Sequence, residues 1–435
     1  MTKGAQSMDT PTSTNRNPWS WIPSLYFAQG IPNIAVATLS VVMYKNLGIS
    51  NTDAAFYTSL LYLPWVIKPL WAPFLELRGT KRFWIVALQY LIGAALGLIA
   101  LTVPAPFFFQ ATLAVFWLVA FSSATHDIAA DGFYLLALSK PQQAAFVGVR
   151  STFFRLSMIV GSGFLVFLAG RLADMTGDMA KAWAIVFAIL SGGFLLVAWF
   201  HSRVLPRLDT DVPSSVSSNP WSGWWTVFSA FFRQTGILSV LGFLLLFRIA
   251  EAQLLKLVIP FMLDEREVGG LALTNEQIGV FYGTFGIVAL TVGGLVGGWL
   301  VSRYGLRKLL WWMVAAMHVP NVVFVLLAMI QPENLGIIGG ALVLEQLGYG
   351  FGFTAYMVYM MMVAADGPHK TAHYAICTGF MALGIMVPGM FSGWIQEQLG
   401  YQNFFLWVVI CAIPSIAACA FIKIRQDFGR KTEQA

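Results

Sequence analysis

The feature that most constrains this chain is a succession of apolar runs, each about twenty residues or longer, cut by glycine, proline and charge. Within a bilayer no water is available to backbone N–H and C=O groups, so each run must satisfy them internally as a helix. The pattern predicts an all-α polytopic membrane protein with twelve transmembrane helices. The predicted spans lie near residues 20–45, 54–75, 83–103, 108–138, 143–170, 180–203, 237–263, 274–302, 307–330, 335–365, 370–398 and 402–424.

Composition supports the same class and excludes others. Only 11% of the residues are charged, against about 25% in a soluble domain. The formal charge of +6 therefore reports membrane topology rather than nucleic-acid binding, because basic residues collect in cytoplasmic loops. Their distribution predicts that both termini are cytoplasmic. The cysteines Cys377, Cys411 and Cys419 lie in apolar segments and have neither metal-ligand nor disulfide spacing.

The same reading divides the chain into five parts. A central stretch, "LPRLDTDVPSSVSSNP", is poor in apolar residues and predicts a flexible linker. The "WSGWWTVFSAFFRQTG" that follows is either an amphipathic helix on the inner leaflet or the start of the seventh span. The predicted parts are a disordered cytoplasmic tail (1–18), an N-terminal six-helix bundle (19–203), a linker with an amphipathic helix (204–236), a C-terminal six-helix bundle (237–424) and a tail (425–435).

The two halves repeat short motifs at matching positions. The loop after the second span reads "APFLELRGTKR", and the loop after the eighth reads "GWLVSRYGLRK". The fifth span ends in "GRLADMTG" and the eleventh in "GWIQEQLG". Two six-helix halves with this loop pattern are typical of the major facilitator superfamily fold, whose substrate site lies near the bilayer midplane between the halves.

Ionisable residues inside the spans are the candidate functional residues, because each costs at least a few kcal/mol (about 3) unless it is paired or hydrated. Counting residues from the cytoplasmic end of each span puts Asp127 level with Arg155. The same count puts Asp131 level with Lys68. In the second half, Arg248 and Glu251 are three residues apart, which allows a local pair, and Lys256 reaches a depth similar to that of Glu345. These four pairings are predictions from depth and spacing alone.

Such pairs could simply hold helices together. Alternatively, they line a hydrated cavity in which a carboxylate exchanges a proton and cations bind a substrate. His126 fits either a hydrogen-bonded packing residue or a titrating group. Gln29, Tyr349 and Tyr356 are candidate substrate contacts, since sugar rings suit aromatic walls with polar rims, although aromatic residues in membrane helices also serve packing.

Several longer motifs resemble the AmpG muropeptide permeases. They include "LPWVIKPLWAPFLE", "FSSATHDIAADGF", "STFFRLSMIVGSG", "FRIAEAQLLKLVIPFML" and "LEQLGYGFGFTAYMVYMMM", in order along nearly the whole chain. The resemblance implies proton-driven import of N-acetylglucosaminyl-anhydromuropeptides across the bacterial inner membrane, with no cofactor beyond the proton gradient. Family positions match Lys68, Asp127, Asp131, Arg155, Arg248, Glu251 and Glu345.

Two departures from the family pattern are visible. His126 stands where the family commonly has glutamine, and the run after Asp131 continues as the uncharged "GFYLLAL". A neutral or smaller amino sugar is therefore an alternative substrate. Other solutes, such as an acyl-coenzyme A, a siderophore or a drug, also stay open. We expect the partners to be a small-molecule substrate, protons and membrane lipids, and the protein to be a monomer that binds no nucleic acid. An intramembrane enzyme built on His126, Asp127 and Asp131, or a non-transporting sensor, are further alternatives.

Overall fold

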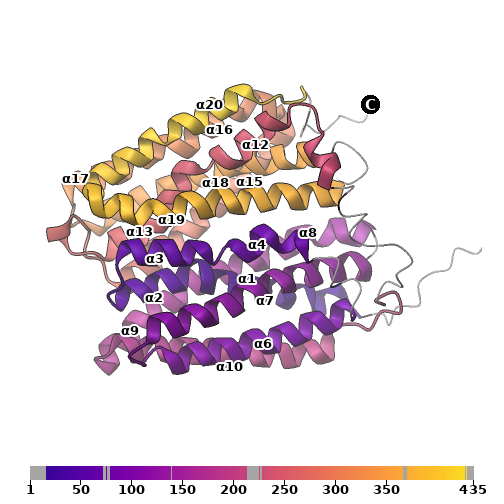
Figure 1. The fold of residues 1–435 in the computed structure, drawn as a ribbon, viewed down its shortest axis with the longest axis horizontal. Helices are drawn as coiled ribbons and strands as arrows, with labels where there is room; N and C mark the ends of the chain where they lie inside the picture. The colour runs from indigo at the N-terminus through magenta and orange to yellow at the C-terminus, as the bar shows by residue number, and fades with distance from the viewer. Residues whose placement is uncertain are drawn as a thin grey trace, which may run out of the picture.

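The computed structural model describes residues 16–71, 75, 79–138, 140–212, 225, 228–365, 370–426 and 428. Most of the predicted N-terminal tail, residues 213–224 and 226–227 of the predicted linker, and most of the predicted C-terminal tail lie outside these residues. In Figure 1 the helices of the first half (indigo to magenta) gather on one side and those of the second half (pink to yellow) on the other. The division into two six-helix parts at the stated residues stays a prediction.

All described regular structure is helical. The first half consists of η1 (Pro18–Ser20), α1 (Ile22–Ile34), η2 (Ala35–Leu39), α2 (Ser40–Asn46), α3 (Asn51–Leu60), α4 (Leu63–Ile67), η3 (Lys68–Leu70), α6 (Lys81–Thr102), α7 (Phe108–Ala137), α8 (Lys140–Met158), η4 (Ile159–Leu165), α9 (Val166–Thr176) and α10 (Met179–Val204). The second consists of α12 (Ile237–Leu246), α13 (Ile249–Leu263), η5 (Arg266–Val268), α14 (Asn275–Val280), η6 (Phe281–Gly286), α15 (Ile287–Tyr304), α16 (Leu306–His318), η7 (Val319–Asn321), α17 (Val322–Ile330), α18 (Leu335–Ala365), α19 (Lys370–Ile410) and α20 (Ala412–Phe421).

The fold confirms a polytopic all-α membrane protein. Within the described residues, ten helices are long and apolar enough to cross a bilayer. One of them, His373–Phe421, has 49 residues and bends at Gly400, where φ is 70°; since twenty helical residues already span about 30 Å, it supplies two crossings. The second predicted span is broken into α3, α4 and η3. The twelve predicted spans thus all correspond to helical segments.

Local sequence signals explain where several helices begin. Ser50, Thr80 and Asp178 each accept a hydrogen bond from a backbone N–H in the first turn of α3, α6 and α10. Thr274 and Gln277 form a reciprocal capping box at the start of α14. These side chains satisfy N–H groups that have no partner inside the helix, so the loops between spans end at defined residues.

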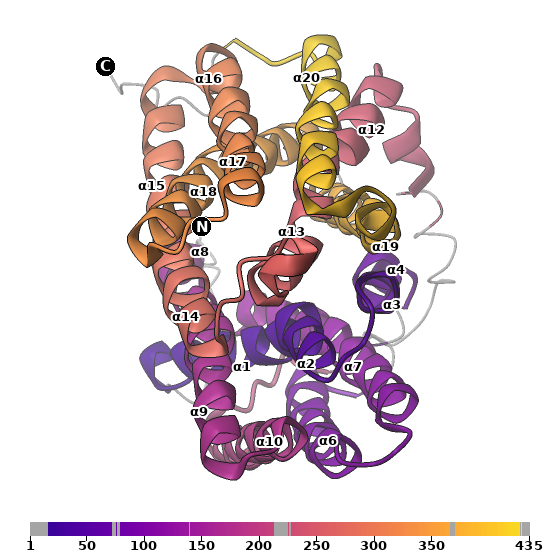
Figure 2. The ribbon, with the colours of Figure 1, turned by 90° about the vertical axis from the view of Figure 1, so that its left-hand side faces the viewer.

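The two halves meet along several helix pairs. Helices α3 and α4 pack on α19, α2 packs on α13, and α9 with η4 packs on α14 with η6. Figure 2 shows α9 and α14 next to each other on one side, and α3 with α4 beside α19 on the other. The segments η2, η4 and η6 are π-helical turns, which are rare and occur often at functional sites.

Gly283 permits the contact between η4 and η6. A Cβ atom at this position would lie 2.1 Å from the Ser162 carbonyl oxygen. We therefore expect Gly283→Ala to lower stability by about 1 to 3 kcal/mol, the usual cost of overpacking a close contact. The thermal unfolding midpoint of the purified protein measures this effect.

Gly192→Ala on α10 is the matched control, because a Cβ there meets no atom within 4 Å. Alanine favours a helix over glycine, so the control should unfold at an unchanged or higher temperature. Equal midpoints for the two variants would contradict a tight contact at Gly283.

Candidate functional site

Asp127 faces the centre of the molecule from α7. Its Oδ2 atom accepts a hydrogen bond of 3.0 Å from the indole Nε1 of Trp65 on α4. Lys68, three residues further along the same segment, is a cation whose charge acts on Asp127, as is Arg150. Sequence depth had predicted Arg155 as this partner, and that pairing is wrong: Arg155 Nη1 lies 3.4 Å from the Thr291 carbonyl oxygen on α15, in the other half.

Asp131 pairs with Arg150 rather than with the predicted Lys68. Arg150 Nη2 lies 2.9 Å from Asp131 Oδ1, and the Tyr26 hydroxyl donates to the same oxygen at 3.3 Å. The guanidinium also stacks 4.6 Å from the centre of the Tyr26 ring. Sequence reasoning missed Arg150, although it lies about one helical turn before Arg155 and as deep in its span as Asp131. Depth alone allows either Lys68 or Arg150 as the partner of Asp131. The direction in which the side chains point around their helices selects Arg150.

Arg248 and Glu251 do not pair with each other. The Arg248 guanidinium donates to the Tyr349 hydroxyl and lies 4.7 Å from the Phe353 ring centre. Glu251 instead contacts His318, with 2.8 Å between Oε1 and Nδ1. The predicted i, i+3 pair assumed an unbroken helix, but the seventh span breaks between α12 and α13 and Arg248 lies at this break.

Lys256 connects the two halves. Its Nζ donates a hydrogen bond of 3.0 Å to Thr58 Oγ1 on α3 and lies 5.2 Å from the centre of the Tyr62 ring. Its predicted neighbour Glu345 is buried in the second half, where Gln346 Nε2 donates to it at 2.9 Å. Lys256 is thus a buried cation that faces polar and aromatic groups rather than a carboxylate.

Two predicted substrate contacts are packing residues. His126 Nε2 lies 3.0 Å from the Gln89 amide, whose oxygen contacts His201 at 2.9 Å, so His126 belongs to a buried chain among α6, α7 and α10. The Tyr356 hydroxyl donates to the Leu244 carbonyl at 2.6 Å and the side chain is fully buried. In both cases the side chain points into its own half, which depth counting cannot detect.

The remaining predicted contacts stay near the interface. Gln29 is buried on α1 and its Oε1 has no hydrogen-bond partner in the described part of the chain. Tyr349 is buried beside Arg248, as described above. Together with Trp65 and Tyr62 they give the centre a mixed aromatic and polar lining, which suits a ring-containing polar solute.

A polar cluster joins the halves at the end of the molecule where α2 meets α3. Lys45 Nζ lies 2.5 Å from Asp264 Oδ1, and the Tyr401 hydroxyl donates to the other carboxylate oxygen at 2.5 Å. Asn51 donates to Gln396 at 2.7 Å and to Tyr401 at 2.9 Å. We call Lys45, Asn51, Asp264, Gln396 and Tyr401 the closing cluster. Sequence reasoning missed it because its members lie at span ends, where polar residues are ordinary.

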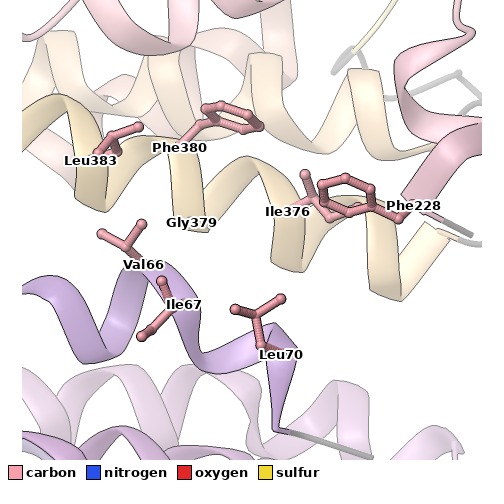
Figure 3. Close-up of a pocket in the computed structure, with 8 residues that line it drawn as sticks. All are labelled: Val66, Ile67, Leu70, Phe228, Ile376, Gly379, Phe380 and Leu383. Carbon is pink, nitrogen blue, oxygen red and sulfur yellow. The ribbon is translucent and has the colours of Figure 1, made fainter. Parts of the chain in front are cut away.

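An apolar pocket lies between the halves toward the opposite end (Figure 3). It has a volume of about 150 Å³. Its lining offers no polar side chain, so it has no chemistry of its own. The lining residues are Val66, Ile67, Leu70, Phe228, Ile376, Gly379, Phe380 and Leu383.

This architecture, with charged residues buried between two groups of membrane helices, is the one expected of a membrane transporter. Residues 24–375 match the family model described as Major Facilitator Superfamily. The chain belongs to this superfamily.

Relatives agree with the family resemblance seen in the motifs. The chain is 25% identical over 403 residues to an anhydromuropeptide permease of Escherichia coli K12, covering 90% of this chain and 77% of that protein. It is 24% identical to a putative transporter AmpG 4 of Rickettsia conorii, covering 92% and 95%. Among solved structures, a D-xylose-proton symporter has a TM-score of 0.72 at 10% identity, covering 95% of this chain and 99% of that one, which shows the shared fold. The chain is therefore an AmpG-like member of the superfamily.

Proposed function

We propose that the protein is a proton-coupled importer of muropeptide or amino-sugar cell-wall fragments, working by alternating access in a bacterial inner membrane. The observation that carries the proposal is the hydrogen bond between Lys256 and Thr58, which puts a buried cation at the junction of the halves. The name of the Escherichia coli relative, an anhydromuropeptide permease, supports the substrate class. Both termini are cytoplasmic in this proposal, and the protein acts as a monomer with protons and lipids as its other partners.

The central residues suit the chemistry of such a substrate. A muropeptide joins sugar rings to a peptide with carboxylates. The rings of Tyr62, Trp65 and Tyr349 offer faces for stacking sugars. Lys256 and Arg248 offer charge-assisted hydrogen bonds to a carboxylate, which are stronger than neutral ones.

Asp127 supplies the proton site in this proposal. A carboxylate that faces Trp65 and Lys68 can hold or release a proton as its neighbours change. The closing cluster holds one end of the molecule together. In this proposal that end is the periplasmic one, and the cluster shuts the central residues off from the periplasm. Rupture of the cluster then exposes them to the periplasm.

Uptake into proteoliposomes tests the function directly. Labelled anhydromuropeptide should accumulate when an inward proton gradient is imposed and should not accumulate without it. Unlabelled acyl-coenzyme A, siderophores and drugs are added as competitors. If one of these compounds inhibits the uptake and cell-wall fragments do not, that compound class is the substrate. If the uptake of every cell-wall sugar is independent of the proton gradient, the proposal is rejected.

Lys256→Gln should raise the substrate concentration for half-maximal uptake by about tenfold or more, since a charged hydrogen bond contributes about 1.5 to 3 kcal/mol. Glutamine keeps a donor for Thr58 but removes the charge. Substrate titration of uptake rates measures the change.

Lys181→Gln is the control, because Lys181 is 67% exposed and pairs only locally with Asp178 at the start of α10. Its titration curve should match that of the wild type. If Lys256→Gln also matches, Lys256 does not bind the substrate.

A further inference from the structure

A carboxylate and an imidazole face each other inside the second half. Glu251 on α13 and His318 at the end of α16 are separated by 2.8 Å, with only 1% and 4% of their side chains exposed. Asn321 Nδ2 donates to the same Glu251 oxygen at 3.2 Å. His318 lay outside every motif singled out in the sequence, so this contact is a property of the fold.

Both partners keep a free polar atom. Glu251 Oε2 and both ring nitrogens of His318 are buried without a hydrogen-bond partner within the described chain, although His318 Nδ1 lies 2.8 Å from Glu251 Oε1. Buried polar atoms without a partner are rare and cost about 1 to 3 kcal/mol each. Each of these atoms is a position where a proton can be added, as O–H on the carboxylate or N–H on the imidazole.

The charges around the pair do not balance without a proton. Glu251 and Glu345 on α18 interact electrostatically. Tyr349 on α18 accepts a hydrogen bond from Arg248 and lies within electrostatic range of both glutamates. Two carboxylates and one guanidinium leave one negative charge. An uncompensated charge at membrane depth is costly, and one proton on Glu251, His318 or Glu345 removes it.

Within the described residues, neighbouring elements bring no further cation within 4 Å of the Glu251 carboxylate. Tyr282 on η6 contributes a hydroxyl group within electrostatic range of Glu345. On the other face of α13, Gln253 receives a hydrogen bond from Trp407 at 2.9 Å and contacts Cys411 at 3.4 Å. Further along α13, Asp264 is paired with Lys45 of α2. Lys256 is a cation that contacts the Thr58 hydroxyl and the Tyr62 ring rather than either glutamate.

We propose that Glu251, His318 and Glu345 form a second proton-holding site, in the C-terminal half. When an anionic group of the substrate binds Arg248, it neutralises the guanidinium charge that had offset the two glutamates. The site then draws in one more proton, which leaves with the substrate when Arg248 is released. This step forms no bond to the substrate, and it rests on the proposed import of a carboxylate-bearing solute.

Infrared difference titration of the purified protein, without substrate, tests the site independently of transport. The carbonyl band of a protonated carboxyl should change with pH in the wild type. The change should disappear in Glu251→Gln and shift to another pH in His318→Gln. The same titrating band in wild type and both variants would overturn the proposal.

Transport assays supply the second readout. Glu251→Gln should reduce gradient-driven uptake by about tenfold or more, as expected when a proton-carrying group is removed, while substrate exchange at equal pH continues. His318→Gln should move the pH profile of uptake. His201→Gln is the matched control, because His201 is equally buried but bonds to Gln89 and Ser24 in the first half; its profile should stay in place.

The infrared and transport experiments together distinguish the second proton-holding site from the proposed transport function. If the wild type shows no proton-driven uptake of cell-wall sugars but its infrared band titrates through Glu251, the proton site stands and the assigned function fails. If uptake is proton-driven and the variants leave both the band and the pH profile unchanged, the function stands and the second site is rejected.

Discussion

Asp127→Asn should reduce proton-driven uptake by about 100-fold, within the range contributed by a group that transfers protons. Asparagine has nearly the same size and its oxygen can still accept the hydrogen bond from the Trp65 indole, which is 3.0 Å long in the wild type. It cannot bind and release a proton near neutral pH. Accumulation under an inward proton gradient, compared with exchange at equal pH in the same proteoliposomes, measures the effect.

Asp131→Asn provides the comparison on the same helix face. Asp131 pairs with Arg150 and 44% of its side chain is exposed, so water can replace a lost contact and the expected effect on coupled uptake is small. A normal gradient response in Asp127→Asn would remove Asp127 from the coupling mechanism. An equal loss in both variants would instead indicate that general charge balance on α7 matters.

Asp264→Ala should open the end of the molecule that holds the closing cluster. The substitution removes the partner of Lys45 and of the Tyr401 hydroxyl and leaves the lysine charge mostly buried. Loss of one partner of a buried pair costs about 3 kcal/mol or more. A cost of about 2 kcal/mol in this partly exposed case would change the ratio of closed to open states by about 30-fold.

Labelling of a single cysteine measures this shift. Ser59 is fully buried on α3 below the closing cluster, so Ser59→Cys in a chain without Cys377, Cys411 and Cys419 reports access from the outside. A membrane-impermeant maleimide should react many times faster when Asp264→Ala is added.

The control substitution is Asp53→Ala, because Asp53 is exposed and bonds only to Ser50 at the start of the same helix. It should leave the labelling rate of the Ser59 position unchanged. Equal rates in Asp264→Ala and Asp53→Ala would show that the closing cluster does not control access.

Agreement between sequence and structure is greatest for features that depend on position along a helix. Apolar length predicted the spans, and the matching loop motifs predicted the superfamily fold that the family model confirms. Depth predicted that Asp127 and Lys256 lie in the interior. Asp127 accepts a hydrogen bond from Trp65 within the first half, and Lys256 donates one to Thr58 across the two halves. Depth follows from a rise of about 1.5 Å per residue, so it can be counted.

The pairings depend on direction around each helix, which depth does not fix. A rotation of about 100° per residue means that an error of one residue in a boundary turns a side chain to another neighbour. Asp131 therefore pairs with Arg150 instead of Lys68. The break before α13 had the same effect in the second half, since it turned Glu251 toward His318 and left Arg248 with Tyr349.

The sequence by itself determined that the chain is a membrane protein of helical spans, because the energy of burying polar backbone in lipid depends on local apolar length. It also determined which residues carry charge in the interior. The tertiary structure decided which charges meet, which polar residues close one end, and that His318 joins the set. Those contacts link residues up to 350 positions apart, as between Asn51 and Tyr401, and only the packing of the two halves brings such residues within hydrogen-bond distance.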